Sequence, residues 1–130
     1  MPDARPAVTV DDKRRLRRES SAIARKLINT DTVLAGAETL ADYRRRFGES
    51  DSYFLRYVLP EMFLSDLLNK CCRHQTHQVS YLLNEHLTDF ASTDVERNLR
   101  GQELAMYRRF GDASGEAQCI RVLKRINSQL

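Results

Sequence analysis

Cysteine and histidine can bind metals or act in catalysis, and three of these residues lie close together near the middle of the chain. Cys71, His74 and His77 are spaced three residues apart. On one α-helix, residues at this spacing fan over about 120° and span nearly two turns, so they cannot all reach one ion. Zinc ligands on helices are usually four residues apart or come from separate elements. The spacing therefore predicts no metal site.

No motif of a catalytic site is present in the sequence. The five glycines are scattered and form no phosphate-binding loop, and neither an HExxH zinc motif nor a nucleophile motif occurs. His86 lies beside Glu85 and near Asp89, but an acid–base neighbour pair of this kind arises by chance in most helical proteins. We therefore expect a protein that is not an enzyme and that carries no cofactor.

A run of cations near the N-terminus has the composition of a phosphate-binding surface. Its residues are Lys13, Arg14, Arg15, Arg17 and Arg18. Such a run neutralises phosphates in nucleic-acid-binding proteins, so nucleic-acid binding is one hypothesis. The acids Asp11, Asp12 and Glu19 border the run, and no aromatic residue interleaves it to stack on bases. A solvated helix face accounts for the same run and is the interpretation we prefer.

The composition indicates which elements position these groups. The chain has 130 residues, of which 42% are hydrophobic and 30% charged, as in a soluble globular domain. Glycine and proline, at five and three residues, are scarce, whereas helix formers such as leucine, arginine, alanine and glutamate are frequent. The sequence predicts an all-α protein, with a flexible tail at 1–10 and a single helical domain at 11–130.

Three features indicate the cellular compartment. Charged residues interrupt the most apolar stretch, so no run reaches the roughly 20 residues of a membrane span. The first ten residues contain acids and prolines, where a signal peptide needs cations and an apolar run. The three cysteines are odd in number, and the adjacent Cys71 and Cys72 make a poor disulfide framework. We expect a reduced, cytoplasmic protein without a membrane partner.

Hydrophobic periodicity predicts a first helix that begins just after Val10. Its buried face is expected to contain Leu16, Ser20, Ile23 and Leu27, with the serine as the weak position. A second helix is expected between the capping pair Thr30-Asp31 and Gly48, which has the place of a left-handed C-terminal cap. The apolar stretch from Tyr53 to Phe90 follows, with the core leucines Leu67, Leu68, Leu82 and Leu83.

Two points of this apolar stretch have alternative interpretations. Pro60 either kinks a helix or lies in the first turn of a new one, where proline is tolerated. The polar insert Arg73–Gln78 is either the middle of one helix of about 30 residues or the turn between two helices, and helix lengths favour the turn.

Two more helices are predicted in the C-terminal part. One follows the cap Ser92-Thr93-Asp94 and ends before the capping glycine Gly111. The segment Asp112–Gly115 is expected to be a turn, and the last helix to run from Glu116 to about Ser128. The inward positions of that helix are Cys119, Ile120, Leu123 and Ile126. In total, the pattern predicts five or six helices packed as antiparallel hairpins.

Two segments resemble each other at a separation of 63 residues. Thr30-Asp31 falls on Thr93-Asp94, and Arg45–Glu49 falls on Arg108–Asp112. Similarity at a fixed period is the signature of repeat folds, so a duplicated three-helix unit is one interpretation. Convergence between two well-capped helices is the other.

The segment Glu103–Ile126 resembles the junction between successive tetratricopeptide repeats. In that family one helix ends in an aromatic residue and cations, a Gly-Asp turn follows, and a Gly-Glu-Ala sequence opens the next helix. The matching residues are Tyr107, Gly111, Asp112, Gly115, Glu116 and Ala117. Leu40–Arg56 is a weaker version of the same pattern. The resemblance covers the minor part of the chain and implies antiparallel helix pairs and a surface that holds another protein.

These observations predict a non-catalytic protein-interaction module, such as an adaptor, a chaperone or a regulatory subunit. Its partner would be another protein or a second copy of the chain. The apolar residues that follow Tyr53 are too closely spaced for one helix face, and an exposed apolar patch marks a partner site. Aromatic residues and methionine are enriched at such sites. The predicted surface consists of Tyr53, Phe54, Tyr57 and Met62, flanked by Arg44, Arg45 and Arg46. The alternative function is nucleic-acid binding through the basic N-terminal run.

Overall fold

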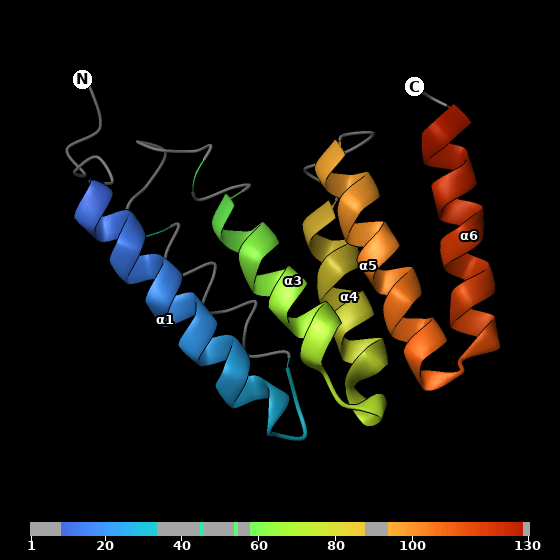
Figure 1. The fold of residues 1–130 in the computed structure, drawn as a ribbon, viewed down its shortest axis with the longest axis horizontal. Coiled ribbons are helices and arrows are strands. Elements are labelled where there is room, and N and C mark those ends of the chain that lie inside the picture. The colour runs from blue at the N-terminus through green and yellow to red at the C-terminus, as the bar shows by residue number, and fades with distance from the viewer. Residues whose placement is uncertain (1–8, 34–44, 46–53, 55–57, 88–93, 129–130) are drawn as a thin grey trace.

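The computed structural model describes residues 9–33, 45, 54, 58–87 and 94–128, and in this part of the chain the fold is all-α, as predicted (Figure 1). These residues form five α-helices and one short 3₁₀ helix, and no strand occurs among them. The helices are α1 (Val10–Ile28), α3 (Leu59–Lys70), α4 (Thr76–Leu87), α5 (Asp94–Phe110) and α6 (Ala113–Ser128), with the 3₁₀ helix η2 at Arg73–Gln75.

The helices form a side-by-side array. α1 packs on α3, α3 packs on α4 and α5, and α5 packs on α4 and α6. Figure 1 shows that α1, α3 and α5 run in one direction and that α4 and α6 run in the other. The pairs α3–α4 and α5–α6 are therefore antiparallel hairpins, and α1 and α6 lie at opposite ends of the array.

Aliphatic side chains between the hairpins form the core. The four predicted leucines, Leu67, Leu68, Leu82 and Leu83, are all buried. They share one cluster with Ala24 of α1 and with Leu99 and Met106 of α5. Burying one leucine side chain contributes about 1.5–3 kcal/mol. The central stretch is thus the part of the sequence around which the described helices pack.

α1 begins at Val10, one residue before the predicted start, with Thr9 as its N-cap. The Oγ1 of Thr9 accepts a hydrogen bond from the backbone N–H of Asp12 at 3.0 Å, and the Asp12 carboxylate accepts one from the backbone N–H of Thr9 at 3.2 Å. This reciprocal pair is a capping box. Ile23, predicted to be buried, is only half-buried, although it packs against both apolar clusters of the structure. The buried residues of α1 are Leu16, Ser20, Ala24 and Leu27.

Both alternatives in the central stretch are decided by the structure. α3 begins at Leu59, so Pro60 lies in its first turn, where its missing N–H costs no helical hydrogen bond. The chain turns here between two helices, as the helix lengths favoured, but the turn is shifted towards the N-terminus of the insert. Cys71 and Cys72 have extended backbone, Arg73–Gln75 form η2, and α4 begins at Thr76, so the second half of the insert is helical. Two helices of 12 residues each therefore replace one long helix.

Two glutamines of the insert bind the backbone at the end of α1 and just after it. The Nε2 of Gln75, which is fully buried, donates to the carbonyl oxygen of Leu27 at 2.9 Å and also to that of Thr30. Gln78 Oε1 accepts from the backbone N–H of Val33 at 2.6 Å, and its Nε2 donates to the carbonyl oxygen of Asp31 at 3.0 Å. The insert thus has a structural role that its polar composition alone did not indicate.

The turn between α5 and α6 is shorter than predicted. Gly111 has φ +69°, the left-handed conformation expected of a capping glycine. Asp112 Oδ1 accepts a hydrogen bond from the backbone N–H of Gly115 at 3.0 Å, which is the bond of a helix N-cap. The prediction that α6 begins at Glu116 is wrong, because this cap starts the helix at Ala113.

Some predictions fall outside the described residues. These are the tail before residue 9, most of the helix that ends at Gly48, and the cap residues Ser92 and Thr93. The repeat at 63 residues depends on the segment Thr30–Glu49, of which only 30–33 and Arg45 are described. The duplicated unit and the tetratricopeptide resemblance therefore stay predictions.

Candidate functional site

Only part of the predicted protein-binding surface lies in the described residues. Arg45 is exposed and Met62 is half-buried. The residues of that surface that fall outside the described part are Tyr53, Tyr57, Arg44 and Arg46.

Phe54, which was predicted to contact a partner, is a core residue in the structure. Its exposed fraction is 3%, and it packs with Leu16 and Leu59 in a small apolar cluster. The Lys13 ammonium and the Arg17 guanidinium lie over its ring, 5.4 Å and 5.6 Å from the ring centre. At these distances the cations are attracted to the aromatic face. Phe54 is therefore covered, and a partner cannot reach it in this conformation.

The cations predicted to bind nucleic acid all lie on α1, but they differ in what they contact. Arg15 lies 3.1 Å from the carboxylate of Asp12 and 3.8 Å from that of Glu19. Arg14 and Arg18 are exposed and form no ion pair with a described residue. Only part of the predicted run is therefore free to meet a phosphate.

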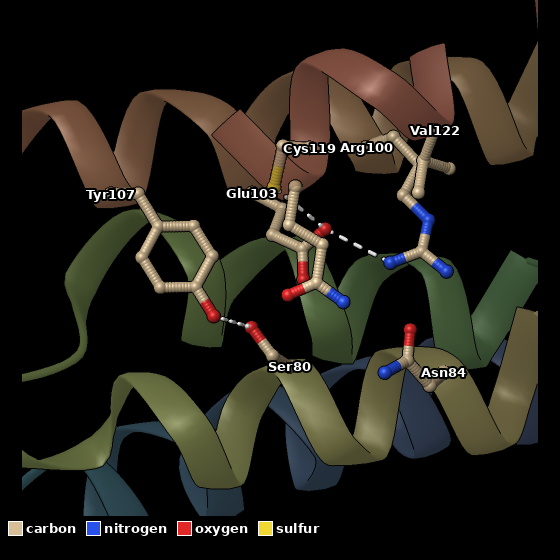
Figure 2. Close-up of a pocket in the computed structure, with 8 residues that line it drawn as sticks. Ser80, Asn84, Arg100, Glu103, Tyr107, Cys119 and Val122 are labelled. Carbon is tan, nitrogen blue, oxygen red and sulfur yellow. Dashed lines mark hydrogen bonds and ion pairs between the residues drawn. The ribbon is translucent and has the colours of Figure 1, made fainter. Parts of the chain in front are cut away.

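A small polar pocket between α4, α5 and α6 is the candidate site that the structure reveals (Figure 2). Its cavity has a volume of about 60 Å³, enough for a few water molecules or for the end of one side chain. The lining residues are Ser80, Asn84, Arg100, Glu103, Tyr107, Gln118, Cys119 and Val122.

Helical spacing brings these residues together. α5 contributes three side chains that are three and four positions apart, and residues at this spacing share one face of a helix. α4 contributes a pair four positions apart, and so does α6, with Cys119 beside it. The antiparallel packing of α5 against both neighbours then points the three faces at one place (Figure 2).

Glu103 is the buried charge at the centre of this pocket. Its side chain is 5% exposed, and that of its partner Arg100 is 11% exposed. Oε1 of Glu103 accepts one hydrogen bond from Nη1 of Arg100 at 2.9 Å and another from Sγ of Cys119 at 3.1 Å. A buried carboxylate is stable in a protein only when it is paired and hydrogen-bonded in this way. The hydrogen bond from Cys119 therefore joins α6 to the buried carboxylate of α5.

Two further groups of the pocket are held neutral. Burial and the neighbouring Glu103 carboxylate raise the pKa of the Cys119 thiol well above its ordinary value of 9.0. Burial also raises the pKa of the Tyr107 phenol, whose hydroxyl shares a hydrogen bond with Oγ of Ser80 at 2.6 Å. A protonated thiol is a poor nucleophile. Among the lining residues, Cys119 therefore acts as a hydrogen-bond donor and not as an activated nucleophile.

A close contact between α5 and α6 fixes the position of Tyr107. A Cβ atom added to Gly115 would lie 2.6 Å from Cγ of the Tyr107 ring, which is closer than real contacts of this kind. Only glycine therefore lets α6 approach the ring. Because the Tyr107 hydroxyl reaches Ser80 of α4, this one side chain joins all three helices of the pocket.

Sequence analysis did not find this pocket. Cys119 was predicted only as a core residue and Tyr107 only as part of the tetratricopeptide-like junction, and the other lining residues belong to no motif. The available signal was Glu103, which lies four residues after Leu99 and three before Met106, on the apolar face of its helix. A carboxylate at a core position needs a partner, and the search for that partner leads to Arg100.

No protein family, curated protein or solved structure matches this chain at a significant level. None of the described helices combines the length and the apolar character that crossing a membrane requires.

Proposed function

We propose that this chain is a non-catalytic protein-interaction module and that a partner protein contacts it at the pocket between α4, α5 and α6. The observation that carries this proposal is the state of Arg100, a pocket residue whose hydrogen bonding is largely unused. Of its five N–H donors, one is used in a hydrogen bond to a described residue, the bond to Glu103. Nε is buried, so a carbonyl or carboxylate oxygen of a partner would accept from the free N–H groups of Nη1 and Nη2.

The size of the pocket favours a partner side chain over a metabolite. Sites for small molecules and cofactors usually enclose about 300–1,000 Å³, whereas this cavity measures about 60 Å³. A space of that volume admits the end of one side chain or a chain terminus. Such a depression anchors a larger molecule whose other contacts lie outside it.

The rim of the pocket suits a polypeptide. Asn84 and Gln118 are exposed, and their amide groups can both donate and accept hydrogen bonds, as a peptide backbone requires. Val122 is half-buried beside them and supplies apolar contact. Arrays of helical hairpins offer extended surfaces of this kind to protein partners. An adaptor, a chaperone or a regulatory subunit would use the surface in this way.

Site-specific photo-cross-linking tests the proposal. Benzoylphenylalanine placed at Gln118, on the rim, is expected to cross-link a discrete protein in an extract of the source cells. The same group at Lys124, which is exposed on the same helix but does not line the pocket, is expected to give no such product. Asn84→Ala should lower the yield from Gln118 at least fivefold, because it removes a rim contact without disturbing the core.

Two outcomes would contradict the proposal, and a third would identify the partner. Equal cross-linking from Gln118 and Lys124 would contradict the proposed site, and no product from either position would contradict the proposed function. A product with twice the mass of the chain would identify the partner as a second copy.

A further inference from the structure

α1 carries a stripe of three exposed arginines, Arg14, Arg18 and Arg25, which we call the α1 arginine stripe. These residues are four and seven positions apart, so they lie within about 40° of one another around the helix. The buried residues Leu16 and Leu27 lie on the opposite side of α1 and pack into the core. Core packing therefore sets the rotation of the helix and turns the stripe towards solvent.

The three arginines of the stripe are not used inside the fold. None of them forms an ion pair or hydrogen bond through its side chain with a described residue, whereas Arg15 is paired with Asp12 and Glu19. Lys13 and Arg17 flank the stripe on one side and lie over the ring of Phe54. α1 has seven Lys/Arg and three Asp/Glu, and the acids lie beside Arg15 or at the first turn. The stripe therefore keeps its full charge towards solvent.

We propose that the α1 arginine stripe binds the phosphate backbone of a nucleic-acid duplex without reading its sequence. Along the helix axis the stripe positions are separated by about 6 Å and about 10 Å, which equals two to three phosphate steps of about 3.4 Å on one strand. A guanidinium group contacts phosphate oxygens with two parallel N–H bonds. The stripe carries no aromatic residue, so it lacks the stacking platform typical of single-strand binding.

A lipid surface fits the stripe less well than a duplex does. A helix that lies on a membrane inserts its apolar face among the lipids. In α1 that face is occupied, because Leu16, Ala24 and Leu27 are buried in the array. The helix would have to leave α3 to expose them. Only its charged face is available while the protein is folded.

An acidic protein segment also fits less well. Protein interfaces rely on a buried apolar or aromatic anchor, surrounded by polar contacts. Around the stripe, α1 offers the half-buried Ser21, the exposed Ala22 and one large exposed apolar side chain, Val10 at the start of the helix. A single valine at one end supplies no aromatic or apolar cluster of this kind. Binding to phosphates needs no such anchor, since counterion release drives it. This interaction is also separate from the pocket, because α1 and α6 lie at opposite ends of the array (Figure 1).

The test is a fluorescence-anisotropy titration of the whole chain with a labelled duplex at about 50 and about 200 mM salt. Three phosphate contacts predict an affinity that falls about 40-fold between these two concentrations. A triple variant with Arg14→Gln, Arg18→Gln and Arg25→Gln should bind at least tenfold more weakly at the lower salt and should lose most of the salt dependence. Its circular dichroism should stay unchanged, because all three side chains are exposed.

A matched control removes the same charge from the other end of the array. Arg121, Lys124 and Arg125 are exposed on α6, and replacing all three with glutamine should leave duplex binding within about twofold of the parent chain. Equal losses in both triple variants would show that net charge alone is responsible and would overturn the proposal. So would the absence of duplex binding at the lower salt. Tighter binding to phosphatidylserine vesicles or to poly-glutamate than to the duplex would also overturn it.

Discussion

The turn between α5 and α6 is held by its own residues, whereas the turn between α3 and α4 combines local hydrogen bonds with hydrogen bonds to residues of other helices. In the first turn the backbone N–H of Gly111 donates to the carbonyl oxygen of Arg108 at 3.2 Å, and that of Asp112 donates to the carbonyl oxygen of Tyr107 at 2.9 Å. These two bonds and a glycine with positive φ make a Schellman motif. All the participants lie within six residues of one another.

The second turn depends on a distant arginine. Arg109 of α5 donates hydrogen bonds to the backbone carbonyl oxygens of Leu68, Asn69 and Cys71, at 3.3, 3.0 and 3.4 Å. These carbonyls lie at the end of α3, where the helix leaves them unpaired and where a cation suits the helix dipole. The α5–α6 hairpin can therefore close through local contacts, whereas the α3–α4 hairpin also depends on helices that are distant in the sequence.

The largest effect is expected in the turn that depends on distant contacts. Gln75→Ala leaves the carbonyl oxygens of Leu27 and Thr30 without their buried donor and opens a cavity. The free energy of unfolding should fall by about 3 kcal/mol, as measured by urea denaturation. Hydrogen exchange should speed up at the C-terminal end of α1. A loss below about 1 kcal/mol would show that this turn stands without the contact.

A somewhat smaller loss of stability is expected at the turn between α5 and α6. Gly115→Ala drives a methyl group into the ring of Tyr107, and overpacking of this kind costs about 2 kcal/mol. Tyr107→Leu removes the ring, so the two changes together should be less harmful than the sum of their separate effects. Additive losses in thermal or urea melts would rule out the proposed clash. Exchange at the end of α1 should stay unchanged in this variant.

A backbone substitution tests the Schellman motif directly. Gly111→Val places a β-branched residue at φ +69°, where it is strained, and should destabilise the protein by about 1.5 kcal/mol. Gly111→Asn is the control, because asparagine tolerates this conformation and should lose less than half as much. If both variants melt alike, the left-handed conformation does not limit stability.

The smallest effect is expected from replacing the buried thiols of Cys71 and Cys119. Burial raises the pKa of both Cys71 and Cys119 above 9.0, but Arg109 opposes the shift at Cys71, whereas Glu103 adds to it at Cys119. The folded state keeps these protons while the unfolded state loses them, so their stabilisation is complete below pH 9 and is lost as the pH rises further.

Each such group should therefore remove up to about 1.4 kcal/mol of stability per pH unit above pH 9. Cys119→Ser should flatten the decline in urea-unfolding free energy between about pH 9 and 10.5 more than Cys71→Ser does. An equal effect of the two substitutions would show that the charges of Arg109 and Glu103 do not distinguish the sites.

The parts of the fold that the sequence predicted are those with local causes. The Gly111 cap could be predicted because the conformation belongs to the glycine itself. The start of α6 was predicted too late because glycine is common in turns, and Gly115 was therefore assigned to one. In the structure the Asp112 side chain accepts a hydrogen bond from the backbone N–H of Gly115 and so caps the helix that contains this glycine. The sequence left two alternatives for the polar insert, a turn or the middle of a helix. The hydrogen bonds of Arg109 and Gln75 that hold this turn join residues far apart along the chain, so they cannot be read from the local sequence.

The candidate site could not be predicted from the sequence either, because it too depends on contacts between residues far apart along the chain. Its residues come from three helices, and no spacing along the chain relates Ser80 to Tyr107 or Arg100 to Cys119 before the helices pack. Phe54 shows the converse error, since an aromatic residue in a crowded apolar stretch was predicted to be exposed. Its burial depends on Lys13 and Arg17, which are some 40 residues away and carry no sign of this role.

The hydrogen bonds of Gln75 also affect the order in which the chain can fold during synthesis. They join η2 to residues 48 and 45 positions earlier, Leu27 and Thr30. Closing loops of this length costs chain entropy that only the finished contact repays. Ribosomes add about 5–20 residues per second, so the end of α1 waits roughly 2 to 10 seconds for its partner. During that interval the first helix has its capping box but lacks the contact that secures its other end.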